Sequence, residues 1–294
     1  MEKLESLASV ARISERVVRV LGQVSNRNKY LLVGTSNPYV LLDTGEGVAE
    51  YIPVLESAFK GQSSPSNLTK PDVSDIILSH WHHDHIAGLP SPVHDLAEGQ
   101  TITTDDGSAT LQVLHAPGHT LDSVALYLAQ DGALFSADTV LGQGTAVFED
   151  LSIYLATLRK LLDFSKTGDG AAYTILYPGH GPVVKDGCGT ISTYIKHRLE
   201  REAQIVAVLR GTGELTGSGQ SITTQDIVSV IYKDYPQNLW LPAAYGVNLH
   251  LRKLEVDGLV RRAGEGDGLE ARWEVIGRQS GTASRSSQPD GHKC

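Results

Sequence analysis

The sequence predicts an α/β protein in which a large domain is followed by a small C-terminal domain. The chain has 294 residues, which suits one large α/β domain with an appendage. Short apolar runs of strand length alternate with segments whose apolar residues recur at the helical period. A glycine-rich stretch at 211–221 then separates this pattern from a shorter and different one. We therefore expect two folded units, with 211–221 as a flexible linker between them.

The large domain is expected to cover residues 1–210. Helical periodicity predicts helices at about 48–60, 151–163 and 188–210. The three apolar runs between 109 and 137 are spaced like consecutive antiparallel strands. Together with the other runs of apolar, β-branched and aromatic residues, they predict strands at 17–21, 30–33, 39–43, 75–79, 109–115, 123–128, 133–137 and 173–177.

The small domain is expected at residues 222–277 and is predicted to resemble a winged helix. Thr224 can cap a helix that Pro236 brings to an end, and a further helix is predicted over 243–256. The segments GLVRR and ARWEVI, on either side of the turn AGEGDG, predict a β-hairpin that would form the wing. The tail at 278–294 is polar and poor in apolar residues, so we expect it to be disordered.

Composition narrows the classes of function. There are 25 Lys and Arg against 34 Asp and Glu, a net charge of −9, which disfavours binding to nucleic acid because phosphates are neutralised by Lys and Arg. The longest apolar runs have strand length, so no membrane span is expected. The N-terminus lacks the apolar core of a signal peptide, and Cys188 and Cys294 are the only cysteines, which favours a reducing compartment and a cytoplasmic location.

The hexapeptide HWHHDH at residues 80–85 is the strongest functional signal. It brings His80, His82, Asp84 and His85 together directly after the predicted strand 75–79. Three imidazoles and a carboxylate at the end of a strand are poorly explained by packing. They are the ligands that suit Zn, Fe or Mn. The hexapeptide therefore predicts a metal site.

Three further ligand-type residues follow apolar runs of their own. They are His119 in APGHT, Asp138 in FSADT and His180 in YPGHG. Seven such residues are enough for two divalent metal ions, and each ion would keep an open position for a shared water molecule. We expect one ion to be held by His80, His82 and His119, the other by Asp84, His85 and His180, with Asp138 bridging the two.

Other residues near these motifs carry weaker signals. His83 is the variable position of the hexapeptide and is expected to face solvent, while Trp81 is expected to pack beside the site. Asp43, at the end of a strand, has two interpretations: it orients a ligand histidine, or it caps a turn. Cys188 lacks a nearby histidine motif, which disfavours covalent catalysis by a thiolate.

The motifs HWHHDH, PGHT, SADT and PGHG, in this order, resemble those of the metallo-β-lactamase fold superfamily over about residues 12–210. Four longer segments are similar to a lactamase-like branch that carries a small C-terminal helical domain. That branch includes fungal lactamase-type thioesterases of non-reducing polyketide synthases and animal lactamase-like endoribonucleases. The resemblance implies an αββα sandwich with a dinuclear site along one edge, and ligand roles for the seven residues. The four segments are FEDLSIYLATLRKL, YPGHGPVV, YIKHRLEREAQI and NLHLRKLEVDG.

The segments GQGTAVFED and NLW favour the thioesterase group within that branch. The expected function is thus a metal-dependent hydrolase of secondary metabolism that releases a polyketide from an acyl-carrier protein by hydrolysing an acyl thioester. Asp84 and Asp138 are the residues expected to be catalytic, and Zn²⁺ is the favoured metal, with Mn²⁺ or Fe as alternatives. Against the pattern of the relatives, the intervals 22–30 and 85–119 are short.

Two alternative functions stay open from the sequence: a single-strand endoribonuclease of the lactamase-like type, and a catalytically impaired relative. The leaving group favours the thioesterase. A pantetheine thiol has a pKa of about 8.5 if it behaves like a free cysteine, so it departs without much help from an acid. A ribose alkoxide is a much poorer leaving group and needs a general acid or a metal ion.

Overall fold

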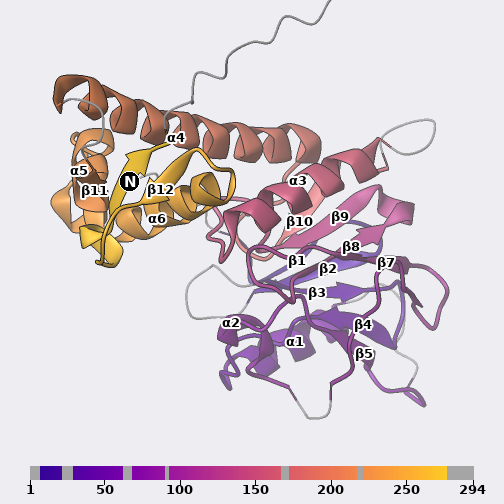
Figure 1. The fold of residues 1–294 in the computed structure, drawn as a ribbon. Helices are drawn as coiled ribbons and strands as arrows, with labels where there is room; N and C mark the ends of the chain where they lie inside the picture. The colour runs from indigo at the N-terminus through magenta and orange to yellow at the C-terminus, as the bar shows by residue number, and fades with distance from the viewer. Residues whose placement is uncertain are drawn as a thin grey trace, which may run out of the picture. The chain divides into compact units, whose positions relative to one another are not determined.

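The computed structural model describes residues 7–21, 29–61, 68–89, 93–166, 172–216 and 221–276 (Figure 1). It contains two compact units, residues 1–199 and residues 200–294, which are called the first and second unit below. None of the helices in the described part of the chain combines the length and the apolar character needed to cross a bilayer.

The first sheet of the first unit has the strand order β1-β2-β3-β4-β5. The pairs β1–β2, β2–β3 and β3–β4 are antiparallel, while β4 and β5 are parallel because helix α1 (Tyr51–Lys60) lies between them in the chain. The strands are β1 (Val10–Arg12), β2 (Val17–Leu21), β3 (Lys29–Val33), β4 (Tyr39–Leu42) and β5 (Val73–Ile77).

The second sheet has the order β10-β9-β8-β7-β6. Strands β6 to β9 pair antiparallel in sequence order, which confirms the antiparallel run predicted between 109 and 137. Helix α3 (Leu151–Ser165) leads to β10, which is parallel to β9. The remaining elements are β6 (Thr101–Thr103), β7 (Thr110–His115), β8 (Val124–Leu128), the 3-10 turn Ala129–Asp131, β9 (Ala133–Ala137) and β10 (Ile175–Pro178).

Alternation of side chains along the strands explains how the layers stack. In β4, Val40 and Leu42 enter the core between the two sheets, whereas Tyr39 and Leu41 face α1. On the other sheet, Leu126 enters the same core, and Tyr127 points the opposite way to stack edge-on against Phe164 of α3. Figure 1 shows α1 and α3 on the outer sides of the two sheets. The predicted αββα sandwich is confirmed.

The second unit is a small helical domain with its own sheet and core. Helix α5 (Thr224–Ile231) begins with a capping box in which Thr223 and Asp226 bond each other's backbone N–H groups. The predicted hairpin is β12–β13, which β11 extends to a three-stranded sheet of order β11-β13-β12. The other elements are β11 (Ile222–Thr223), the 3-10 turns Gln237–Leu239 and Gly268–Glu270, α6 (Trp240–Val256), β12 (Val260–Arg262) and β13 (Arg272–Val275).

The linker expected at 211–221 is corrected in part. Residues 211–216 continue helix α4 (Gly187–Thr216), and 221 leads directly into β11. Each glycine costs only about 1 kcal/mol in a helix, so a long helix that is already formed can continue through such a segment. The chain divides within this helix, between Leu199 and Glu200, because Ile205 and Leu209 belong to the core of the second unit.

Two smaller expectations are also corrected. Thr223, rather than Thr224, caps α5, since the Asp226 carboxylate completes the capping box. Strand β5 ends at Ile77, before the expected Ser79, because the backbone N–H of Ser79 turns to the Asp43 carboxylate. The predicted disordered tail at 278–294 and the linker residues 217–220 lie outside the described residues.

Candidate metal centre

The seven predicted ligands follow strands, either in loops or in the short helix α2 (His83–Ile86), and sheet topology brings these segments together. Strands β7, β9 and β10 run in the same direction, so His119, Asp138 and His180 follow them at one edge of the second sheet. The backbone N–H of Val124, at the start of β8, donates to the carbonyl of Ser79 at 2.8 Å. This bond ties the end of β5 to that edge, where α2 carries Asp84 and His85.

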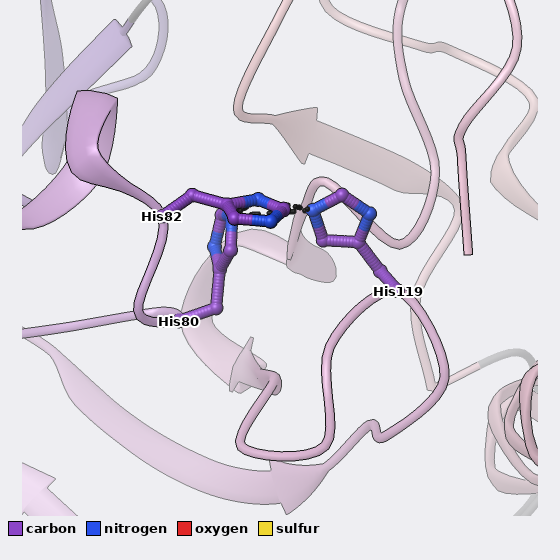
Figure 2. A group of neighbouring side chains, drawn as sticks. All are labelled: His80, His82 and His119. Atoms are coloured by element: carbon purple, nitrogen blue, oxygen red, sulfur yellow. Dashed lines mark hydrogen bonds between the residues drawn. The ribbon is translucent and has the colours of Figure 1, made fainter. Parts of the chain in front are cut away.

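The first cluster consists of His80, His82 and His119, whose ring nitrogens point toward one another (Figure 2). His82 Nδ1 lies 3.0 Å from His80 Nε2 and 3.0 Å from His119 Nε2, and the last two are 3.2 Å apart. A ring nitrogen of a neutral imidazole carries either a hydrogen or a lone pair. Among three such nitrogens in mutual contact, two must carry the same, so at least one of the three contacts cannot be a hydrogen bond. In a tetrahedral zinc site, bonds of about 2.0–2.1 Å separate ligand nitrogens by about 3.3 Å. The cluster fits a metal ion better than a hydrogen-bonded triad.

The second cluster consists of Asp84, His85 and His180. Asp84 Oδ2 lies 3.7 Å from His85 Nε2 and 3.4 Å from His180 Nε2. This cluster too collects nitrogen and oxygen atoms of the kinds that bind divalent ions.

Asp138 lies between the two clusters. Its Oδ2 atom is 3.0 Å from His180 Nε2 and 3.9 Å from His119 Nε2, and its Oδ1 atom is 3.6 Å from His85 Nε2. One carboxylate thus contacts histidines of both clusters. This is the position that a bridging ligand requires.

Two buried atoms indicate that the centre is built for a further group. His85 Nε2 and Asp138 Oδ1 are buried and have no hydrogen-bond partner. Unsatisfied buried polar atoms are costly, at about 1–3 kcal/mol each, and coordination to a metal ion would satisfy them. Gly179 keeps this space open, because a Cβ atom there would collide with Asp138 Oδ1. The residues present therefore fit a pair of metal ions.

Asp43 orients His85, as one of the two interpretations of its sequence predicted. His85 Nδ1 lies 2.8 Å from Asp43 Oδ2, so the opposite ring nitrogen is left to face the second cluster. Ser79 holds the same carboxylate through its backbone N–H at 2.7 Å and its hydroxyl at 2.9 Å. Ser79 was not predicted as a functional residue, although its position directly before HWHHDH was a usable signal.

His119 is oriented in a similar way by a backbone group that the sequence did not reveal. Its Nδ1 atom donates to the carbonyl of Val147 at 2.9 Å, which directs Nε2 to the first cluster. Val147 belongs to the loop 142–150, whose sequence resembles that of the thioesterase relatives but carries no local signal of this bond.

The two clusters differ in electrostatics. Burial lowers the pKa of His80 to about 2 and also lowers the pKa of His119, so both rings are neutral at pH 7. Burial also disfavours the charged form of His85 and His180, but nearby carboxylates outweigh it and raise their pKa values to about 11 and about 9. The hydrogen bond from His180 lowers the pKa of Asp84 to about 2. Without metal, His85 and His180 therefore hold protons that His80 and His119 do not.

This difference predicts unequal proton release when metal ions bind. At pH 7, filling the second cluster should displace a proton from each of His85 and His180, whereas filling the first should displace none from His80 or His119. The affinity of the second cluster should therefore rise with pH, most steeply below about pH 9 where His180 is still protonated.

The measurement is titration calorimetry with Zn²⁺ in buffers of different ionisation enthalpy. A His82→Ala variant isolates the second cluster and a His180→Ala variant isolates the first. Equal proton release by the two variants would contradict the prediction.

Gly118 is required where the loop of His119 passes α3. Its φ is +132°, and an added Cβ atom would lie 2.7 Å from the backbone nitrogen of Tyr154. We expect Gly118→Ala to lower the free energy of unfolding by about 2–4 kcal/mol through strain and overpacking. Chemical denaturation of the metal-free protein measures this. Gly107→Ala is the control, since it also has a positive φ of +68° but open space around it, and it should cost less.

The sandwich fold and the paired His/Asp clusters together define the class of metal-dependent hydrolases. The model of the Metallo-beta-lactamase superfamily matches residues 23–91 and 90–180, and that of the Beta-lactamase associated winged helix domain matches residues 223–273. The chain therefore belongs to the metallo-beta-lactamase superfamily and carries the associated winged-helix domain, which confirms the winged-helix-like domain predicted from the helices and hairpin of the C-terminal part.

Relatives with sequence similarity occur in animals and fungi. The chain is 35% identical to a Beta-lactamase-like protein 2 homolog of Drosophila melanogaster, over 87% of this chain and 93% of the relative. It is 33% identical to an Atrochrysone carboxyl ACP thioesterase of Paecilomyces divaricatus, over 78% of this chain and 76% of the relative. Among solved structures, a Beta-lactamase domain protein from Burkholderia ambifaria has a TM-score of 0.70 at 17% identity, covering 91% of this chain and 93% of that one.

Proposed function

We propose that this metallo-beta-lactamase-family hydrolase is a thioesterase that releases a polyketide from the acyl-carrier protein of a non-reducing polyketide synthase. The observation that carries the proposal is the contact of Asp138 with histidines of both clusters, which supports a dinuclear centre. The fungal relatives named as Atrochrysone carboxyl ACP thioesterases support the substrate class and the partner.

In this proposal His80, His82 and His119 would hold one ion, Asp84, His85 and His180 would hold the other, and Asp138 would serve both. A pair of divalent ions, with Zn²⁺ favoured, would supply a water molecule of lowered pKa and a Lewis acid for the carbonyl to be attacked. The chain contributes the orientation of the rings, through Asp43 on His85 and the Val147 carbonyl on His119.

The two carboxylates have different tasks in the proposal. The Asp138 side chain is only 11% exposed, so its oxygens are available to the two clusters and little else. The Asp84 side chain is 33% exposed, and its low pKa keeps it ionised at neutral pH. Asp84 can therefore accept a hydrogen bond from a water molecule beside the thioester carbonyl and hold that water in position.

The leaving group fits this set of residues. A pantetheine thiolate departs near neutral pH without a strong acid, so the seven residues suffice for thioester hydrolysis. A cytosolic location also belongs to the proposal and rests on the two cysteines of the chain.

The test is a side-by-side assay of the metal-loaded full chain on an acyl-pantetheine thioester, on a carrier-bound polyketide and on single-stranded RNA. We expect release of the acid from the thioesters, and little cleavage of RNA by a chain of net charge −9. Release no faster than with the Asp138→Asn variant would overturn the proposal. RNA cleavage that copurifies with the protein and is lost in Asp84→Ala would favour the endoribonuclease instead.

A further inference from the structure

Three exposed apolar residues lie beside ligands of the first metal cluster, in the chain or through one direct contact. Trp81 is 54% exposed, Leu121 is 69% exposed and Val147 is 66% exposed. A single exposed apolar residue is ordinary on a protein surface, but three attached to one cluster of ligands are not. We call Trp81, Leu121 and Val147 the apolar rim.

Each residue of the apolar rim is tied to the cluster by a direct link. Trp81 stands between His80 and His82, and its ring centroid lies 4.9 Å from that of His82. Leu121 is two residues beyond His119. Val147 accepts the hydrogen bond of His119 Nδ1 at 2.9 Å. These links place the backbone of all three residues beside the cluster.

The loops that carry the apolar rim are held in place. The Arg198 guanidinium donates to the Ala146 carbonyl at 2.8 Å and lies 4.8 Å from the centre of the Phe148 ring. Ala146 and Phe148 are the two neighbours of Val147 in the chain, so the backbone is held on both sides of Val147. Beside Leu121, the Thr120 and Ser123 hydroxyls are 2.7 Å apart. Because these exposed residues sit on anchored backbone, little ordering entropy would be lost when they contact a ligand.

Charge indicates the kind of ligand. Asp122, Glu149 and Asp150 are exposed carboxylates within three residues of Leu121 or Val147. No Lys or Arg stands within three residues of any member of the apolar rim. Arg198 of helix α4, which contacts the loop of Val147, already donates to the Ala146 carbonyl. Such surroundings repel the phosphates of a nucleic acid and accept an uncharged apolar group.

We infer that the apolar rim binds the aromatic, apolar part of the acyl group and makes the enzyme prefer such thioesters over short aliphatic ones. The inference rests on the proposed function and adds the chemistry of the acyl group to it. Trp81 offers a ring face for stacking, and Leu121 and Val147 offer apolar surface that a bound ring would remove from water.

The first experiment compares kcat/KM for the N-acetylcysteamine thioesters of 2-naphthoic acid and acetic acid. The preference for the naphthoyl ester should fall about tenfold in Leu121→Ser and in Val147→Ser, with unchanged metal content. Leu68→Ser is the matched control, since Leu68 is 95% exposed and is not part of the apolar rim. An unchanged preference in both rim variants would overturn the inference.

A binding experiment separates this inference from the proposed function. The non-hydrolysable thioether analogue of the naphthoyl substrate is titrated into the metal-loaded protein by calorimetry. Binding that weakens about tenfold in Leu121→Ser supports the apolar rim even if no thioester is hydrolysed. Equal binding of the naphthoyl and acetyl analogues, or their displacement by single-stranded RNA, would overturn the inference.

Discussion

Replacement of Asp138 by asparagine is expected to lower kcat/KM for a thioester by at least about a hundredfold and to reduce the bound metal. Loss of a residue that only hydrogen-bonds to a metal ligand already lowers metal affinity or activity by about tenfold to a hundredfold. Asp138 itself contacts histidines of both clusters, so a larger effect is expected. Asparagine keeps the shape of the side chain but removes its charge, so a lost bridge is the expected cause. Steady-state kinetics and elemental analysis of the same preparation measure the two effects.

Asp75→Asn is the matched control for Asp138→Asn. Asp75 is an exposed carboxylate in the middle of β5, so this change removes the same charge away from the ligand set. It should leave both turnover and metal content at the level of the unchanged chain. If Asp138→Asn also kept two ions and full turnover, the bridging role of Asp138 would be wrong.

Replacement of Asp43 by asparagine is expected to weaken metal binding at the second cluster by about tenfold to a hundredfold. The Asp43 carboxylate lies 2.8 Å from His85 Nδ1, and without it the ring loses both its orientation and its negative partner. Asn is the suitable replacement because Asp43 has a φ of +60°, a conformation that asparagine tolerates. Competition with a chromophoric chelator measures the affinity for Zn²⁺.

Two comparisons make the Asp43 result specific. The first cluster should keep its affinity in Asp43→Asn, because its rings are oriented by other groups, such as the Val147 carbonyl on His119. Ser79→Ala keeps the Asp43 carboxylate but removes a hydroxyl that lies 2.9 Å from Asp43 Oδ2 and 2.9 Å from His80 Nδ1, so it should have a smaller effect on the second cluster. If the second cluster bound Zn²⁺ equally well with and without the Asp43 carboxylate, Asp43 would act only in the turn.

The local pattern of apolar and turn residues was sufficient to predict most strands and helices of this chain. Strand β9 was predicted at the same residues, 133–137, because Ala-Leu-Phe-Ser-Ala is an apolar run between turn residues. The predicted ends of strands and helices were less accurate where a residue far away in the chain determines them. Strand β5 ends early because Asp43, far away in the chain, bonds the backbone of Ser79. Helix α4 runs past its predicted end, and its later part belongs to the core of the second unit.

By itself, the sequence determined the identity of the seven candidate ligands and the strand ends that carry them. Both depend on residue type and short-range periodicity, which are local properties. Only the tertiary structure decided that Asp43 contacts His85, that Asp138 reaches both clusters, and that Trp81, Leu121 and Val147 are exposed to solvent. Asp43 meets His85 because the parallel strands β4 and β5 end side by side. Asp138 meets His119 and His180 because β7, β9 and β10 run in one direction and end at the same edge of their sheet.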